Sequence, residues 1–230
     1  MKEKIKTIIL IVIAIAIIVL IGIIGYGYFK KATMEVKNPI LTMEVEGFGT
    51  VKMELYPDQA PENVANLVNL ANRGFYNGTK FHRVVKDFMI QAGTKDGDGS
   101  TGAKLSNLKD GGEDKEYGIK GEFVANGVNN KIKFEEGVVG VARADYTQYS
   151  SDLKEESYNS GNSQFFIMTK ENTGLNGLYT AIGRVTEGMD VVNRIAEEDT
   201  DYSDRPLDEQ KIKSMTVETF GVDYPEPEKC

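Results

Sequence analysis

The stretch of sequence that decides the fold is Phe81-His82-Arg83-Val84-Val85-Lys86-Asp87-Phe88-Met89-Ile90-Gln91. Successive side chains of a β-strand point to opposite faces, so Met89 and Gln91 share one face of a strand, and Phe88 and Ile90 share the other. The strand before it presents Arg83. The segment predicts two adjacent strands that bring together a guanidinium, bulky apolar groups and a carboxamide, a combination that can hold a proline.

Periodic patterns on both sides of this segment predict a strand pair and two helices. Apolar and polar residues alternate over 40–46 and 50–55, which predicts an antiparallel hairpin. Pro61 stands at a first helical position, and the helical spacing of apolar residues after it predicts a helix that stops at Gly74. A second helix is predicted to begin with Thr186 as its cap. Its apolar face contains Met189, Val192, Ile195 and Ala196.

The remaining strand signals lie mostly between the two helices. They cover residues 81–85, 88–91, 137–142, 163–168, 179–185 and 211–220. We therefore expect a mainly β fold: a closed eight-stranded antiparallel barrel capped by two α-helices and preceded by one N-terminal transmembrane helix. Two long loops interrupt it, at about 94–133 and 145–162. The second is interpreted as a solvated insertion.

The amino terminus carries an apolar run from Ile8 to Gly25 behind a short lysine-containing segment. Crossing a bilayer takes about 20 apolar residues, whereas the apolar region of a cleaved signal peptide has about 7 to 15. The run therefore predicts a lipid-bilayer anchor over residues 8–29, and a pilin-like assembly helix is a weaker alternative. We expect the domain that follows the anchor to lie outside the cytoplasm, because a short charged segment before a first apolar run is how export signals begin.

This interpretation divides the chain into four parts. The predicted parts are a cytoplasmic segment and anchor at 1–29, a linker at 30–38, a folded domain at 39–223 and a tail at 224–230.

Composition excludes several classes of function. The chain has 230 residues and a net charge of −8, which argues against a nucleic-acid partner. His82 and Cys230 are the only histidine and cysteine, which excludes a histidine-rich metal site and an internal disulfide. The glycine-rich segment 97–102 precedes no helical pattern, so it does not predict a nucleotide site. Asp96 begins a poor match to a calcium loop, because the sixth position is not glycine. We expect no metal and no cofactor.

Three ordered motifs carry a resemblance to a known family. They are Phe81-His82-Arg83-Val84-Val85-Lys86-Asp87-Phe88-Met89-Ile90-Gln91-Ala92-Gly93, Gly161-Asn162-Ser163-Gln164-Phe165-Phe166-Ile167 and Leu175-Asn176-Gly177-Leu178-Tyr179-Thr180-Ala181-Ile182-Gly183-Arg184-Val185. With them, the chain resembles the cyclophilin family of peptidyl-prolyl cis-trans isomerases from about Ile40 to Val222. The resemblance implies that proline-containing polypeptides are the partners, and that isomerisation is non-covalent.

The resemblance also implies roles for individual residues. Arg83 is similar to the catalytic arginine, which hydrogen-bonds the prolyl nitrogen, and Gln91 and Gln164 to the groups that hold the substrate backbone. Ala142 and Arg143 fall where the family lays main chain against the residues before the proline. The proline pocket itself is expected to be formed by Phe88, Met89, Phe166, Leu175 and Tyr179.

The sequence departs from the family at the cap of this pocket. Gly174 stands where many relatives have an indole, Tyr179 where many have a histidine and Arg143 where asparagine is frequent. Isomerase activity should survive, whereas binding of the family's cyclic-peptide inhibitor is put in doubt. His82 is expected to be a structural hydrogen-bonding residue. The leading interpretation is an isomerase for the folding of exported or membrane-proximal proteins; the alternative is a proline-peptide-binding chaperone or scaffold in which turnover is dispensable.

Overall fold

The computed structural model describes residues 6, 12–13, 15–26, 37–108 and 111–230. The chain forms two units, Met1–Lys37 and Asn38–Cys230. In the first, residues 15–26 are helical and their large apolar side chains are exposed. No helix in the described part of the chain is long and apolar enough to cross a membrane. The predicted anchor falls partly outside the described residues, at 8–11, 14 and 27–29.

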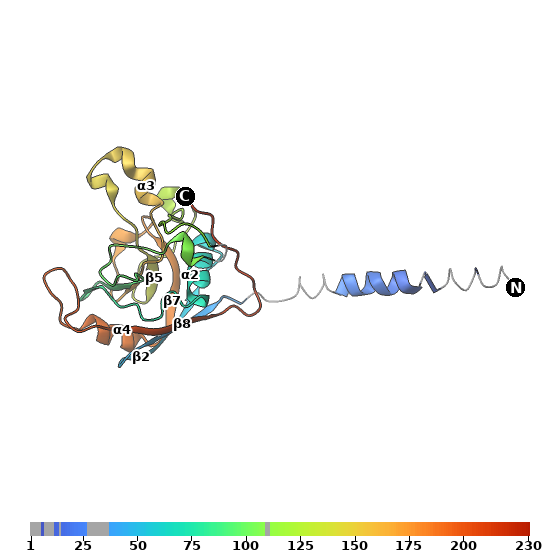
Figure 1. The fold of residues 1–230 in the computed structure, drawn as a ribbon, viewed down its shortest axis with the longest axis horizontal. Coiled ribbons are helices and arrows are strands. Elements are labelled where there is room, and N and C mark those ends of the chain that lie inside the picture. The colour runs from blue at the N-terminus through green and yellow to red at the C-terminus, as the bar shows by residue number, and fades with distance from the viewer. Residues whose placement is uncertain (1–5, 7–11, 14, 27–36, 109–110) are drawn as a thin grey trace. The chain divides into compact units, whose positions relative to one another are not determined.

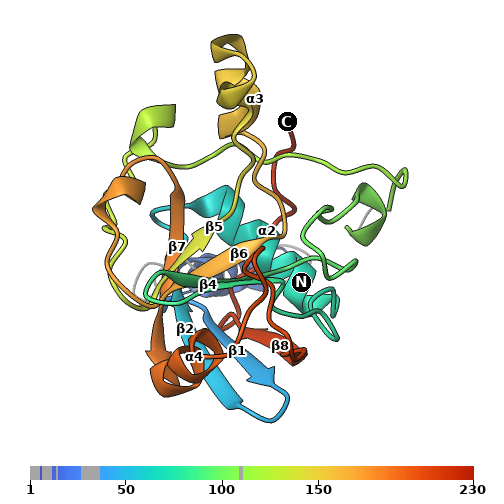
Figure 2. The same cartoon turned by 90° about the vertical axis from the view of Figure 1, so that its left-hand side faces the viewer.

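The second unit is a curled sheet of eight strands with helices packed against it (Figures 1 and 2). The strands are β1 (Ile40–Val45), β2 (Gly49–Leu55), β3 (Arg83–Val85), β4 (Met89–Ala92), β5 (Val138–Val141), β6 (Phe165–Met168), β7 (Thr180–Glu187) and β8 (Ile212–Glu218). The α-helices of this unit are α2 (Pro61–Asn72), α3 (Lys154–Tyr158) and α4 (Met189–Ala196). Five short 3₁₀ turns lie in the connections: η1 (Leu105–Asn107), η2 (Val124–Asn126), η3 (Tyr146–Gln148), η4 (Ser151–Leu153) and η5 (Thr173–Leu175).

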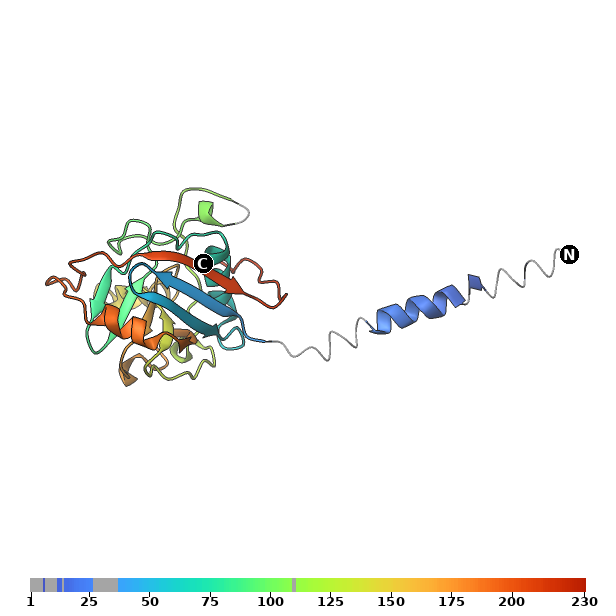
Figure 3. The ribbon, with the colours of Figure 1, turned by 90° about the horizontal axis from the view of Figure 1, so that it is seen from below.

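The strand order is β3-β4-β6-β5-β7-β2-β1-β8, and all pairs are antiparallel. Figure 3 shows β8 beside the hairpin of β1 and β2. The prediction of a closed barrel is wrong, because no strand ladder joins β3 to β8 in the described residues. β3 has only three residues, and the amide of Val84 in it binds the carbonyl of Asp204, which lies in a connecting turn. An isolated bridge between Lys80 and Lys211 spans the gap.

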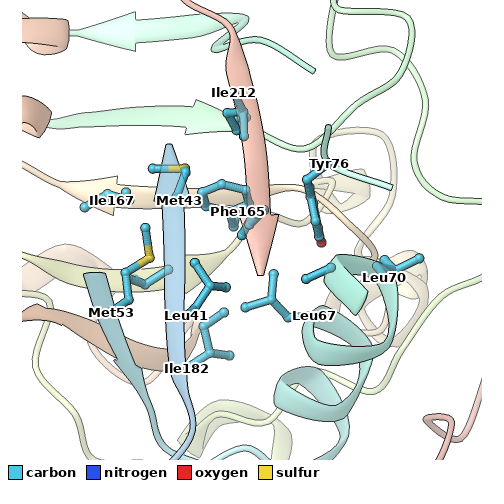
Figure 4. Packing of buried hydrophobic residues seen from close by; sticks show 14 of the residues in the cluster. Leu41, Met43, Met53, Leu67, Leu70, Tyr76, Phe165, Ile167, Ile182 and Ile212 are labelled. Carbon is cyan, nitrogen blue, oxygen red and sulfur yellow. The ribbon is translucent and has the colours of Figure 1, made fainter. Parts of the chain in front are cut away.

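The main hydrophobic core lies between the inner face of the sheet and α2 (Figure 4). In β1 every second side chain is buried, namely Leu41, Met43 and Val45, as alternation predicts. Phe165 of β6 lies in this core, edge-on to Tyr76 with 5.7 Å between ring centroids. A second, smaller cluster lies on the other face of β6 and contains Met89, Phe134, Val138, Phe166, Met168 and Ala181. It forms the floor beneath the predicted site.

Both predicted helices are present, but their starts are decided by distant residues. Ala60, at the cap of α2, offers no side-chain hydrogen bond. Instead the buried carboxylate of Glu122 accepts from the amides of Glu62 (3.1 Å) and Asn63 (2.9 Å). The predicted cap of α4, Thr186, lies within β7, and Gly188 takes the cap position with φ 86°. A Cβ there would lie 2.3 Å from the carbonyl oxygen of Thr50, so only glycine fits.

The insertion differs from expectation, and the predicted tail makes contacts with the domain. The insertion at 145–162, predicted to be a plain loop, contains η3, η4 and α3. In Figures 1 and 2 α3 lies at the end of the domain opposite α4. The tail at 224–230 lies against the domain, where Asn69 donates to the carbonyl of Tyr224 (3.2 Å) and the amide of Cys230 donates to that of Gly118 (2.9 Å).

Candidate active site

The structure brings nine of the ten predicted site residues to one hollow of about 280 Å³. Its lining residues are Arg83, Phe88, Met89, Gln91, Ala142, Arg143, Phe166, Leu175 and Tyr179. The tenth, Gln164, lines a neighbouring hollow of about 270 Å³, which shares Gln91, Ala142 and Arg143 with the first. The two hollows therefore adjoin, and their common wall is formed by these three residues.

Strand register explains why residues far apart in sequence converge here. Arg83 of β3 pairs with Gln91 of β4, and Gln91 pairs with Phe166 of β6. Partners directly opposite in a sheet point to the same face, so the guanidinium, carboxamide and aromatic ring lie in a row across three strands. Phe88 also reaches the hollow, although alternation assigns it to the face opposite Met89. It lies before β4 begins, after Asp87 with φ 57°, and this turn breaks the alternation.

The floor of the hollow is aromatic and closely packed. Phe166 stacks on Phe134 at 5.6 Å between ring centroids and meets the ring of Tyr179 edge-on at 5.9 Å. A Cβ at position 140 would lie 2.4 Å from Phe166 and 2.7 Å from Phe134, so Gly140 gives these rings their space. Sequence reasoning missed Phe134. The signal that could have found it is its place as an apolar residue at the end of a long polar loop.

The guanidinium of Arg83 is held at one nitrogen. Nε donates to Oδ2 of Asp204 (3.2 Å), and the side chains of both residues are 43% exposed. The backbone carbonyl of Asp204 also accepts from the amide of Val84 (2.8 Å), which fixes the turn against β3. In the described part of the chain no hydrogen bond to the terminal amino groups of Arg83 is found, so they are available to a ligand. Asp204 lies 121 positions from Arg83, and no local pattern indicates it.

On the catalytic role that the resemblance implies for Arg83, replacing Asp204 with alanine should lower kcat/KM modestly, because Arg83 keeps its charge but loses the anchor for its Nε. Exposed ion pairs contribute about 0.2–1 kcal/mol, which corresponds to a decrease of about one and a half- to fivefold. Steady-state isomerisation of a proline peptide measures it. Glu135→Ala, which removes the exposed partner of Arg184 away from the hollow, is the matched control. Equal rates for wild type and the Asp204 variant would show that the pair does not position the arginine.

The two glutamines fix each other's orientation. Nε2 of Gln164 donates to the carbonyls of Gly99 (3.0 Å) and Thr101 (3.2 Å), so its amide oxygen faces Gln91. That oxygen accepts from Nε2 of Gln91 (2.9 Å). The amide oxygen of Gln91 is therefore turned away from Gln164. The loop that supplies the two carbonyls is itself held by the carboxylate of Asp96, which accepts from the hydroxyl of Ser100 (3.1 Å).

His82 is buried behind this loop. It is 7% exposed, and its Nδ1 has no hydrogen-bond partner in the described residues, so the predicted hydrogen-bonding role is wrong for that atom. Its ring packs against Gly99, where a Cβ would lie 2.6 Å from Cδ2. Burial lowers the pKa of His82, while Asp96 and Asp98 partly oppose the shift. The ring therefore fills space behind the loop.

Stability should fall between about pH 7 and pH 5 because of His82. In the unfolded chain its pKa is about 6.5, so the unfolded state takes up a proton in this range while the folded state resists protonation. Above this range both states are neutral and the effect vanishes. Since His82 is the only histidine, His82→Gln should flatten the dependence of the urea midpoint on pH between 7.5 and 5.5. The same slope in both proteins would contradict this assignment.

Most of the chain matches a known protein family. The family described as "Cyclophilin type peptidyl-prolyl cis-trans isomerase/CLD" matches residues 40–217. Mouse "Peptidyl-prolyl cis-trans isomerase-like 1" is 36% identical over 165 residues, which are 71% of this chain and 84% of that protein. A "Probable peptidyl-prolyl cis-trans isomerase" of Brucella suis is 36% identical over 171 residues, covering 74% and 78% of the two chains.

Solved structures agree with these relatives. A Cryptosporidium parvum cyclophilin type peptidyl-prolyl cis-trans isomerase superimposes with a TM-score of 0.64 and 26% identity, covering 79% of this chain and 98% of that one. The same protein in the presence of the dipeptide Ala-Pro gives a TM-score of 0.63, with 27% identity and coverages of 78% and 98%. From Ile40 to Val217, this chain belongs to the cyclophilin-type peptidyl-prolyl cis-trans isomerase family.

Proposed function

We propose that the chain catalyses the cis-trans isomerisation of X-Pro peptide bonds in polypeptide clients. The observation that supports this most directly is the hollow in which Arg83 stands beside an apolar floor of Met89 and Phe166. Such a floor suits a proline ring. A related solved structure in the presence of Ala-Pro supports the same class of ligand.

The chemistry required is the loss of amide resonance. Rotation about a peptide bond faces a barrier of about 18–20 kcal/mol, because resonance gives the C–N bond partial double-bond character. A hydrogen bond from a terminal amino group of Arg83 to the prolyl nitrogen favours the pyramidal nitrogen of the twisted state over the planar ground state. The Asp204 contact at Nε leaves those groups free to do so. No covalent intermediate is required.

The other site residues orient the substrate in this proposal. The ring is held by Phe88, Met89, Phe166, Leu175 and Tyr179, while the carbonyl on the other side of the bond swings. Gln91, locked by Gln164, offers a polar group to the moving backbone. Ala142 lies at the common wall of the two hollows, where the residues before the proline would cross. Each group thereby acts on one part of an X-Pro unit.

An isomerisation assay tests the proposal. The full chain should accelerate exchange of a short X-Pro peptide, which by itself takes roughly tens to hundreds of seconds. A rate equal to the uncatalysed one would overturn the proposed activity.

The alternative function is a chaperone that binds proline segments without turnover. An experiment in cells distinguishes it: if a variant with inactivated Arg83 complements loss of the protein, binding alone is sufficient.

We also propose that the N-terminal segment attaches the domain to a membrane, outside the cytoplasm, where the clients are exported or membrane-proximal proteins. The support is the apolar run from Ile8 to Gly25 and the exposure of its described apolar side chains, such as Ile18 at 67%. Exposed apolar surface of this extent marks an interaction site. Protease added to intact cells should remove the domain, and complete protection of the domain would contradict the orientation.

A further inference from the structure

The insertion at 145–162 is docked onto the wall of the hollow. The side chain of Ser157 in α3 is completely buried, accepts from Nη1 of Arg143 (3.0 Å) and donates to the carbonyl of Ala144 (2.8 Å). A solvated loop would leave such a hydroxyl in water. The burial of Ser157 shows that α3 forms a specific contact with the segment that follows β5.

Arg143 lies between the insertion and the hollow. Its guanidinium carbon lies 5.1 Å from the ring centroid of Tyr158 in α3 and 4.6 Å from that of Tyr179. Its Nε donates to the carbonyl of Leu178 (3.1 Å), immediately before Tyr179 in the chain. The ring centroid of Phe123 lies 5.8 Å from the same guanidinium carbon. A guanidinium held within about 6 Å of three aromatic rings and hydrogen-bonded at two nitrogens has little freedom to move.

The contacts continue from Arg143 to the floor of the hollow. Tyr179 lines the hollow and packs edge-on against Phe166, with an angle of 86° between the two rings. Arg143 itself lines both hollows. Ser157 and Tyr158 line neither hollow. A continuous series of contacts therefore leads from the insertion to the proposed binding site of the proline ring. It runs through Tyr158, Arg143, Tyr179 and Phe166.

We propose that Ser157 and Tyr158 are positioning residues, through which the insertion sets the affinity of the hollow for proline peptides by holding Arg143 against Tyr179. This inference rests on the proposed function, because it assigns a role in the same site. Arg83 is held separately, by Asp204, so the insertion should affect substrate binding rather than the rate of the bound substrate. The insertion thereby tunes the affinity of the hollow in this chain.

The experiment compares two tyrosines of the same insertion. Tyr158→Ala removes the ring under Arg143, whereas the matched control Tyr149→Ala removes a ring that is 78% exposed and lines neither hollow. Cation–π contacts contribute about 0.5–1 kcal/mol, so Tyr158→Ala should raise KM about two- to fivefold with kcat unchanged, and Tyr149→Ala should change neither. Ser157→Ala should raise KM in the same direction.

A double variant tests whether Tyr158 acts through Arg143 or only by stabilising the fold. Arg143→Ala combined with Tyr158→Ala should bind no more weakly than Arg143→Ala alone, because both act through one guanidinium. A wild-type KM for Tyr158→Ala, an equal rise for Tyr149→Ala, or additive effects in the double variant would overturn the inference.

A binding measurement distinguishes failure of this inference from failure of the proposed isomerase function. It measures the affinity of the same variants for a fluorescently labelled Ala-Pro peptide by anisotropy. If the wild-type chain binds this peptide without turning it over, the proposed isomerase function fails, and the ranking of variants by affinity still decides the role of the insertion. If the affinities of wild type and Tyr158→Ala are equal, the inference fails whatever the turnover.

Discussion

Arg83→Ala should lower kcat/KM for a proline peptide by about 10²–10³-fold under the proposed mechanism, in which the substitution removes one preorganised donor that stabilises the transition state. The guanidinium lines the hollow beside an apolar floor, and a proline ring bound on that floor would exclude water and so strengthen the proposed interaction with the prolyl nitrogen. Its side chain is 43% exposed and lies outside the main core, so the fold should survive the substitution.

Two further variants sharpen this test. Arg83→Lys should recover little activity, because an ammonium lacks the planar fork that can bind Asp204 through Nε while presenting its other donors to the substrate. Arg184→Ala removes an exposed arginine of β7 that pairs with Glu135 and lines neither hollow, so its rate should equal wild type. Wild-type turnover by Arg83→Ala in the same assay would remove the mechanism.

Phe165→Ala should lower the free energy of unfolding of the domain by about 3–5 kcal/mol, as expected for a large buried aromatic residue. Phe165 is 1% exposed and packs in the main core against Tyr76. Its ring belongs to the same cluster as residues of α2, β1 and β2. Truncation therefore leaves a cavity that the surrounding closely packed elements cannot fill. Urea unfolding followed by near-ultraviolet circular dichroism measures the change.

The neighbouring Phe166 is the matched comparison, because it points to the opposite face of the same strand. Its ring lies in the smaller cluster under the hollow. Phe166→Ala should weaken peptide binding, seen as a raised KM, and should destabilise the domain less than Phe165→Ala, since its cavity opens to water. If the two variants lost equal stability and bound peptide equally well, the division of β6 into a core face and a site face would be wrong.

Local periodicity in the sequence was sufficient to predict several strands and helices. The alternation of buried residues in β1 and the helical spacing of α2 were readable from the sequence, because the period of side-chain direction is a property of each backbone conformation. The resemblance to cyclophilins added the site residues, of which nine line one hollow. Their roles stay predictions until the variants are measured. The membrane anchor also stays a prediction, supported by the apolar run from Ile8 to Gly25 and by the exposure of its described side chains.

Other features required residues that the chain brings together from far apart. Asp204 binds Arg83, which lies 121 positions away in the sequence. Glu122 caps α2 by accepting from the amides of Glu62 and Asn63, which lie 60 and 59 positions away. Neither residue belongs to a local pattern. The insertion, which composition indicated to be solvated loop, buries Ser157 against Arg143. Such contacts depend on the path of the whole chain.

What the sequence by itself determined is therefore the regular strands and the two longer helices, including the strand pair that carries Arg83 and Gln91, together with the family. Only the tertiary structure decided that the sheet stays open between β3 and β8, that Asp204 holds Arg83, and that α3 docks on the wall of the hollow. The physical reason is the distance along the sequence over which each interaction acts. Side-chain periodicity is set by the dihedral angles of neighbouring residues, whereas strand pairing at the sheet edges and ion pairs depend on which distant segments the fold brings together.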